Sequence, residues 1–306
     1  MATLSTATTS AKPILALKGV RIVSLALNLP GPAALMRCRA MGASCVKLEP
    51  PPHPSAPKGT SGDPMGLYNR SAYAQLHDGM RIACVDLKTE KGQKALHREL
   101  AKADVLLTSF RPSALRKLGL EWQTLHGKYP MLSLVTIVGA PGARAEEPGH
   151  DLTYLAENDL VSGLELPPTL YADMGGSLMA SEAVLQVRMH QLLTGKGVRL
   201  EVALSEAAAY LALPRAWGLT KPGSAVGGAH AGYRVYPCKD GRAALAALEP
   251  HFAAALGAAV GLPNSHIMAM FAPETHIAVA SYLSSKTRAE LDALAIEKDI
   301  PLFTLG

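Results

Sequence analysis

Aromatic and charged residues are both scarce in this chain of 306 residues. Phe, Trp and Tyr make up 5% of the sequence and Asp, Glu, Lys and Arg 18%, whereas hydrophobic residues reach 48%. A chain with so little charge and so much apolar surface to bury is a globular protein, which excludes an intrinsically disordered one. Because aromatics are few, we expect a core of Ala, Leu and Val carried mainly on helices.

Several functional classes lose their sequence support. No apolar run approaches the roughly 20 residues that a membrane-spanning helix needs, so no membrane partner is expected. The net charge of +5 is dispersed, without a Lys/Arg-rich run or interleaved aromatics, so no nucleic-acid partner is expected. Residues 1–16, rich in Ser, Thr and Ala and without the apolar segment of a signal peptide, are predicted to be a disordered tail.

The cysteines exclude two further kinds of site. No pair of them has the CxxC spacing, so neither a metal site nor a disulfide framework is predicted. We expect the cysteines to be small buried residues that stay reduced in the cytoplasm. The four are Cys38, Cys45, Cys84 and Cys238.

Short apolar runs alternate with helical patterns over the first two thirds of the chain. This alternation predicts right-handed βαβ units and therefore an α/β fold with a parallel sheet. Residues 49–80, rich in Pro and Gly, are predicted to be one long loop. The predicted strands are 20–25, 44–48, 82–87, 105–107, 132–137 and 198–204.

A second, smaller α+β domain is predicted beyond a Gly-rich segment. Asp240-Gly241 is a hairpin turn signal between two strand-like runs, and a helix is expected to begin at Glu249. The predicted organisation is a tail (1–16), a large Rossmann-like domain (17–218), a linker (219–228), a small α+β domain (229–285) and a shortened return to the large domain (286–306).

The most informative motif is Gly149-His150-Asp151, followed by Asp173 at the head of a predicted helix. A His and a carboxylate on either side of a cleft suit proton transfer to and from carbon. His150 and Asp173 also have ordinary structural explanations. Asp is a favoured N-cap residue, and a lone His is often a hydrogen-bonded structural residue. We expect Asp173 at or near the N-cap, with Gly175 and Gly176 leaving backbone N–H groups free for an anion or a thioester oxygen.

Common catalytic fingerprints are missing. The loop after residue 137 lacks GxGxxG spacing, and the chain has no GxxxxGK[ST], HExxH or GxSxG. Hydride transfer, phosphoryl transfer, zinc proteolysis and α/β-hydrolase chemistry therefore have no support from the usual motifs.

Collinear segments from about residue 17 to about residue 303 resemble the CaiB/BaiF family, the class III CoA-transferases, which also contains the α-methylacyl-CoA racemases. Any one segment is weak, but their common order is specific, and the chain is identified as a member. The segments are residues 17–23, 30–32, 41–49, 85–88, 110–112, 118–120 and 194–197.

The resemblance implies a Rossmann-like large domain, a small domain and an interlocked homodimer. It also implies acyl-CoA substrates, with no metal and no permanently bound cofactor. In the transferase branch the aspartate that matches Asp173 is the nucleophile. In the racemase branch the same aspartate is one of two bases; the other is the His of a Gly-His-Asp motif, supported by a Glu of a Glu-Pro-x-Phe motif.

The chain matches all three racemase positions with His150, Asp173 and Glu249, whereas transferases usually carry an aromatic residue in place of His150. We therefore expect a 2-methylacyl-CoA racemase or epimerase in which Glu249 orients His150 and N–H groups near Asp151 stabilise the enolate. A CoA-transferase using Asp173 is the alternative. An inactive relative is the third hypothesis, since the C-terminus is short and several basic CoA contacts are replaced. The remaining candidates for CoA phosphate contacts are Lys47, Arg81, Arg111 and Lys117.

Overall fold

The computed structural model describes residues 14–57, 59–263 and 267–306. The chain divides into two compact units between Leu211 and Ala212. The predicted boundary at 218/219 is therefore several residues too late. The predicted tail lies outside the described residues up to residue 13; residues 14–16 lead into a turn in which Lys18 N–H donates to the carbonyl of Leu15 at 3.0 Å.

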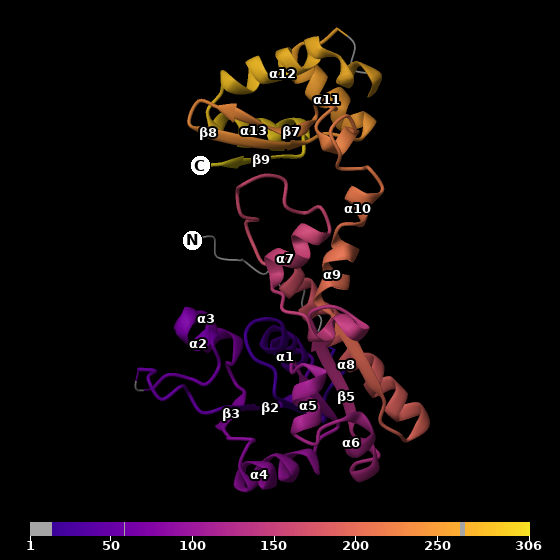
Figure 1. Cartoon of the computed structure of the whole chain (residues 1–306). Coiled ribbons are helices and arrows are strands. Elements are labelled where there is room, and N and C mark those ends of the chain that lie inside the picture. The colour runs from indigo at the N-terminus through magenta and orange to yellow at the C-terminus, as the bar shows by residue number, and fades with distance from the viewer. Residues whose placement is uncertain (1–13, 58, 264–266) are drawn as a thin grey trace. The chain divides into compact units, whose positions relative to one another are not determined.

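The first unit contains a six-stranded parallel sheet in the order β3-β2-β1-β4-β5-β6 (Figure 1). This confirms the predicted α/β class. Strands β4 and β5 are buried along their whole length, as expected for a sheet covered on both faces. The strands are β1 (Arg21–Ser24), β2 (Ser44–Glu49), β3 (Arg81–Cys84), β4 (Val105–Thr108), β5 (Ser133–Val138) and β6 (Arg199–Ala203).

Helices pack on both faces of this sheet through two separate apolar clusters. One cluster joins α1 and α8 to the sheet through small and aliphatic residues such as Ala34, Leu35 and Val184. The other joins α4, α5 and α6 to the opposite face through Leu96, Leu115 and other leucines. Their bounds are α1 (Pro30–Ala40), α4 (Glu90–Leu100), α5 (Pro112–Lys117), α6 (Trp122–Lys128) and α8 (Tyr171–Thr194).

The predicted long loop at 49–80 was only partly right. It contains two short helices, α2 (Met65–Tyr68) and α3 (Arg70–Leu76). The Asp63 carboxylate accepts from Met65 N–H at 2.9 Å, and the Asn69 side chain accepts from Ala72 N–H at 3.0 Å. The Asn69 contact caps α3, whereas the N-cap of α2 is Pro64, without a side-chain cap. Both helices are too short for their periodicity to be seen in the sequence.

The first unit also contains η1 (Gly142–Glu146), α7 (Asp151–Glu157) and α9 (Leu204–Leu211). Helix α8 ends at its C-cap, Gly195. Gly195 has φ 68° in the left-handed region, which glycine adopts easily. Helix α9 begins at Leu204, directly after β6, and packs on both α7 and α8. The elements that carry the His150 and Asp173 motifs are thus held by a common neighbour.

The second unit is a three-stranded antiparallel sheet, in the order β7-β8-β9, covered by helices. The predicted hairpin is present, with Cys238 paired to Gly241. Residues 286–306 belong to this second unit, where β9 pairs with β8 and Leu302 is in register with Leu245. The elements are α10 (Leu213–Ala216), η2 (Ala225–Gly227), β7 (Tyr233–Cys238), β8 (Gly241–Ala246), α11 (Pro250–Val260), η3 (Ile267–Phe271), α12 (Pro273–Ser284), α13 (Arg288–Lys298) and β9 (Leu302–Leu305).

The cysteines are free thiols but are not uniformly buried. Cys38 and Cys45 lie in the core, where burial raises their pKa values to about 12 and about 11. Cys84 is exposed and Cys238 only half-buried, so the expectation of four buried residues was wrong for these two. Within the described residues no helix is long and apolar enough to cross a membrane.

Candidate active site

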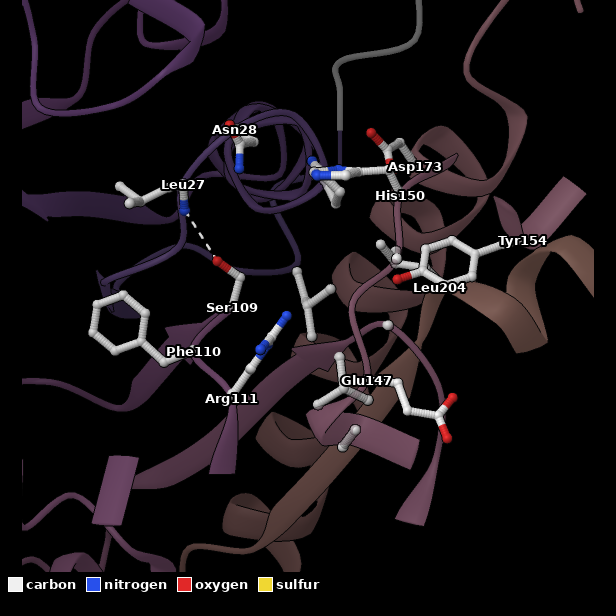
Figure 2. A pocket seen from close by; sticks show the side chains of 16 residues that line it. Leu27, Asn28, Ser109, Phe110, Arg111, Glu147, His150, Tyr154, Asp173 and Leu204 are labelled. Atoms are coloured by element: carbon white, nitrogen blue, oxygen red, sulfur yellow. Dashed lines mark hydrogen bonds between the residues drawn. The ribbon is translucent and has the colours of Figure 1, made fainter. Parts of the chain in front are cut away.

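A cleft opens where the strand order of the large sheet changes direction, between β1 and β4. Chain connections leave these neighbouring strands toward opposite sides, so the loops that follow them separate, and open α/β sheets bind ligands at this point. Both predicted catalytic motifs reach the same cleft (Figure 2). It is lined by Leu27, Asn28, Pro30, Ser109, Phe110, Arg111, Ile137, Val138, Gly139, Ala145, Glu147, Gly149, His150, Tyr154, Asp173 and Leu204.

His150 stands at the N-cap of α7 with an exposed side chain. Its backbone is fixed by Thr153: the His150 N–H donates to Thr153 Oγ1 at 3.1 Å, and that hydroxyl donates to the His150 carbonyl at 2.7 Å. The exposed imidazole lines the cleft directly. It is therefore available to a ligand in the cleft.

Asp173 occupies the third position of α8, near the N-cap as expected, although the capping residue itself is Leu170. Its backbone N–H donates to Oδ1 of the buried Asp151 at 2.9 Å. Burial and, secondly, the negative charge of Asp151 raise the pKa of the Asp173 carboxyl to about 7. A carboxyl with this pKa exists both with and without its proton near neutral pH, which suits general acid–base chemistry.

Gly175 and Gly176 do not supply the anion-binding N–H groups that we expected. They lie beyond the first turn of α8, where N–H groups bond to carbonyls of the preceding turn. Their role is close packing: a Cβ at position 176 would stand 2.2 Å from Cδ2 of Leu204, and one at 175 would stand 3.1 Å from Cδ1 of Leu211. These glycines let α9 approach α8.

Sequence reasoning missed several residues of the cleft. Tyr154 lies one turn after His150 on α7, and the α carbons of Gly139 and Gly149 approach it so closely that a Cβ would stand 2.2 Å and 2.5 Å from its hydroxyl oxygen. Asn28 and Ser109 lie within three residues of the ends of the predicted strands 20–25 and 105–107, at the change of strand order. That position was a usable signal, because residues after such strands line the ligand cleft.

The four predicted CoA contacts are not equivalent. Arg111 lines the cleft with an exposed side chain. Lys117 lines a separate apolar depression beside Lys88 and Phe110. Arg81 forms an ion pair with Glu99 at 2.6 Å and remains about half exposed.

Lys47 is fully buried and therefore differs from the other three. Its ammonium forms ion pairs with Asp63 and, at 3.0 Å, with Glu49, and lies 2.8 Å from Nε2 of His77. An ammonium has only three N–H donors, so none is left for a phosphate. The expectation that Lys47 contacts CoA was therefore wrong, and its role is in the core.

The same cluster is the candidate metal set among the described residues. Ligand atoms of Glu49, Asp63 and His77 lie within 4.8 Å of one another. The Lys47 ammonium contacts all three side chains and takes the place of a cation. These residues act as an ion-pair network.

Glu249 lies in the second unit, at the N-cap of α11. Its side chain is exposed and makes no capping hydrogen bond. The local helix therefore does not need this carboxylate.

Comparisons with known proteins identify a family. The model of CoA-transferase family III matches residues 17–305, and the chain belongs to this family. The chain is 31% identical over 206 residues to a cinnamoyl-CoA:phenyllactate CoA-transferase of Clostridium sporogenes, covering 63% of this chain and 50% of that protein. It is 29% identical over 296 residues to the mouse α-methylacyl-CoA racemase, covering 90% of this chain and 73% of that protein.

Solved structures agree on the fold. A CaiB/BaiF family protein from Brucella suis aligns over 95% of this chain and 84% of its own, with a TM-score of 0.76 and 21% identity. The relatives thus carry the names of two different activities on one fold, and the match to the clostridial transferase spans only half of that protein.

Proposed function

Because the chain belongs to CoA-transferase family III, we propose that it racemises or epimerises 2-methylacyl-CoA thioesters by 1,1-proton transfer. The observation that carries the proposal is the shared cleft of His150 and Asp173, together with the pKa of about 7 at Asp173. Racemisation needs two acid–base groups in one cleft, because one takes the proton from the α-carbon and the other returns a proton to it. No permanently bound cofactor is needed, since the CoA thioester is the substrate.

The reaction begins with a thioester whose α-carbon lies between the two side chains. In one direction neutral His150 removes the α-proton, the C–H electron pair moves into an enolate, and protonated Asp173 donates a proton to the other face of the carbon. In the other direction the Asp173 carboxylate removes the proton and the His150 imidazolium returns one. Each turnover leaves the two groups in exchanged protonation states.

The developing enolate oxygen needs donors. The start of α7, at Asp151, presents backbone N–H groups at the positive end of a helix, next to His150 in the cleft. A donor of this kind contributes about 3–4 kcal/mol to the transition state in comparable oxyanion sites. We propose that Asp151 has two tasks, holding the Asp173 backbone and bringing this helix start to the thioester.

Cationic side chains are proposed to bind the phosphates of CoA. Arg111 is best placed because it lines the cleft itself, and Lys117 and Arg81 lie exposed on the same unit. We also propose a supporting catalytic role for Glu249, like that of the matching Glu in the racemase branch that the chain resembles.

A CoA-transferase is the second candidate, favoured by the clostridial relative and by the partial exposure of Asp173. In that reaction the Asp173 carboxylate attacks the thioester carbonyl, the C–S bond breaks and CoA thiolate leaves a mixed anhydride. The thiolate then attacks the Asp173 carbonyl and releases the first acid, and the acceptor acid takes CoA in the reverse sequence. His150 has no task in this scheme.

The deciding experiment is α-proton exchange in D2O with single-enantiomer 2-methylacyl-CoA thioesters, followed by mass spectrometry and chiral analysis. Deuterium uptake with loss of enantiomeric purity is the expected result. Binding of CoA without uptake, combined with CoA transfer between added acids, would establish the second candidate. A preparation that binds no CoA would favour an inactive relative.

The homodimer and the cytoplasmic location expected from the resemblance also remain proposals. Large apolar side chains exposed on α8, including Leu178, Met189 and Leu193, support association with a second copy. Sedimentation analysis of the purified chain measures this directly, and a monomer at micromolar concentration would contradict it.

A further inference from the structure

Asn28 is a polar side chain in the cleft to which neither proposed reaction assigns a task. It follows β1 and lines the cleft together with His150 and Asp173 (Figure 2). Its side-chain amide is half-buried and makes no hydrogen bond to any residue that the structure describes. The amide is not among the buried polar atoms that lack a partner, so its atoms reach water, and a ligand group in the cleft can replace that water.

The Asn28 backbone is held firmly in an uncommon conformation. Its φ of 63° lies in the left-handed region, which among non-glycine residues Asn and Asp adopt most readily. Its N–H donates to Oδ1 of Asp63 at 3.0 Å, and the preceding N–H of Leu27 donates to Oγ of Ser109 at 3.1 Å. Two side chains from distant segments therefore fix the loop.

Asp63, which accepts a hydrogen bond from the Asn28 N–H, is itself held by a buried ion pair. Asp63 is fully buried and forms an ion pair with the fully buried Lys47. Breaking such a pair leaves a buried charge uncompensated, so the ion pair is expected to persist. The buried network thus ends, through Asp63, at the backbone of a residue in the cleft.

We propose that Asn28 determines substrate specificity by hydrogen-bonding a hydroxyl or carbonyl group on the acyl part of the thioester. A primary amide offers two donors and one acceptor and suits both groups, whereas an alkyl chain leaves it unpaired. A site built to hydrogen-bond a polar group rejects the analogue that lacks it. The inference rests on the proposed action on acyl-CoA thioesters and narrows their class to acyl groups with a polar substituent.

The test compares two thioesters of equal chain length, 2-methylacyl-CoA and 3-hydroxy-2-methylacyl-CoA. Both kcat/KM for α-proton exchange and Kd from calorimetry are measured. The unmodified protein is expected to favour the hydroxylated thioester by about tenfold, the worth of one well-made hydrogen bond. Asn28→Gly keeps the left-handed backbone accessible but removes the amide, and should bring this ratio close to one.

Asp299→Gly is the matched control. Asp299 also has a left-handed backbone, with φ 51°, but caps α13 in the second unit. This variant should retain the preference of the unmodified protein.

The outcomes separate the inference from the proposed reaction. In one outcome the protein binds the hydroxylated thioester more tightly, Asn28→Gly abolishes this difference in Kd, and neither thioester exchanges its α-proton. This outcome supports the inference and rules out the racemase assignment. Exchange with no preference for the hydroxylated thioester overturns the inference and keeps the racemase. An equal loss on both thioesters in Asn28→Gly also overturns it, because the residue would then only shape the loop; failure to bind either thioester overturns both.

Discussion

The backbone N–H of Asp173 donates a 2.9 Å hydrogen bond to Oδ1 of Asp151, a residue 22 positions earlier in the chain. This contact ties the first turn of α8 to the start of α7. The same carboxylate contributes to the raised pKa of Asp173, after burial. One buried side chain therefore positions the backbone of a proposed catalytic residue and tunes its acidity.

The proposed roles of His150 and Asp173 predict different losses. His150→Ala should abolish racemisation but spare CoA transfer, because only proton transfer needs the imidazole. Asp173→Ala should abolish both activities. Loss of a positioned acid–base group typically lowers a rate by about 10²–10⁴-fold, which exchange in D2O measured by mass spectrometry can resolve. Unchanged α-proton exchange in His150→Ala would remove the racemase assignment.

The pKa of Asp173 predicts how stability depends on pH. The folded-state pKa is about 7 and the ordinary value 3.8, so between these values the folded protein holds a proton that the unfolded chain releases. Stability contributed by this group is therefore lost as pH rises through that window. Asp173→Asn removes the titration and should raise Tm relative to the unmodified protein by about 2–4 °C at pH 8, with a smaller gain at pH 5.

Differential scanning calorimetry at several pH values measures this effect. Glu182→Gln is the control, because Glu182 is an exposed carboxylate on the same helix. Its Tm difference should not change with pH. The same pH dependence in both variants would show that burial of Asp173 is not the cause.

The close approach of α9 to α8 predicts that Gly176→Ala is destabilising. The added Cβ would stand 2.2 Å from Leu204, so α9 has to shift, and overpacking of this kind costs about 1–3 kcal/mol. Gly127→Ala in α6 is the matched control, since a Cβ there meets no atom within 4 Å. That change should stabilise by about 0.4–1 kcal/mol. Urea unfolding measures both, and equal effects would contradict the packing role.

The buried ion-pair network predicts a large effect at Lys47. Lys47→Met leaves the buried carboxylates of Asp63 and Glu49 without their cation and should cost about 3–5 kcal/mol. Lys94→Met is the comparison, because Lys94 pairs with Glu90 on the exposed surface of α4, where such pairs contribute about 0.3–0.5 kcal/mol. The free energies of unfolding of the two variants, measured by chemical denaturation, should differ by several kcal/mol. A small effect at Lys47 would mean that the network is not needed for stability.

Much of the fold follows from local sequence. Apolar runs such as 132–137 and the Thr89 cap of α4 are short-range signals, and the structure has β5 and α4 there, with the Thr89 side chain accepting from Gly92 N–H. The Asp-Gly turn predicted the β7–β8 hairpin in the same way. The short helices α2 and α3 were not predicted, because four and seven residues are too few for a periodic pattern.

The residue types of the candidate site, and the resemblance they support, were readable from the sequence alone: a His at 150 and acidic residues at 151 and 173, in an apolar setting. Their relation was decided only by tertiary structure. Burial and the charge of Asp151 set the pKa of Asp173, and the strand order brought Asn28 and Arg111 to the same cleft. Lys47 has the sequence context of a surface cation, yet folding places it in the core with Asp63 and Glu49. Burial and pairing between distant segments are properties of the packed chain, which no local pattern encodes.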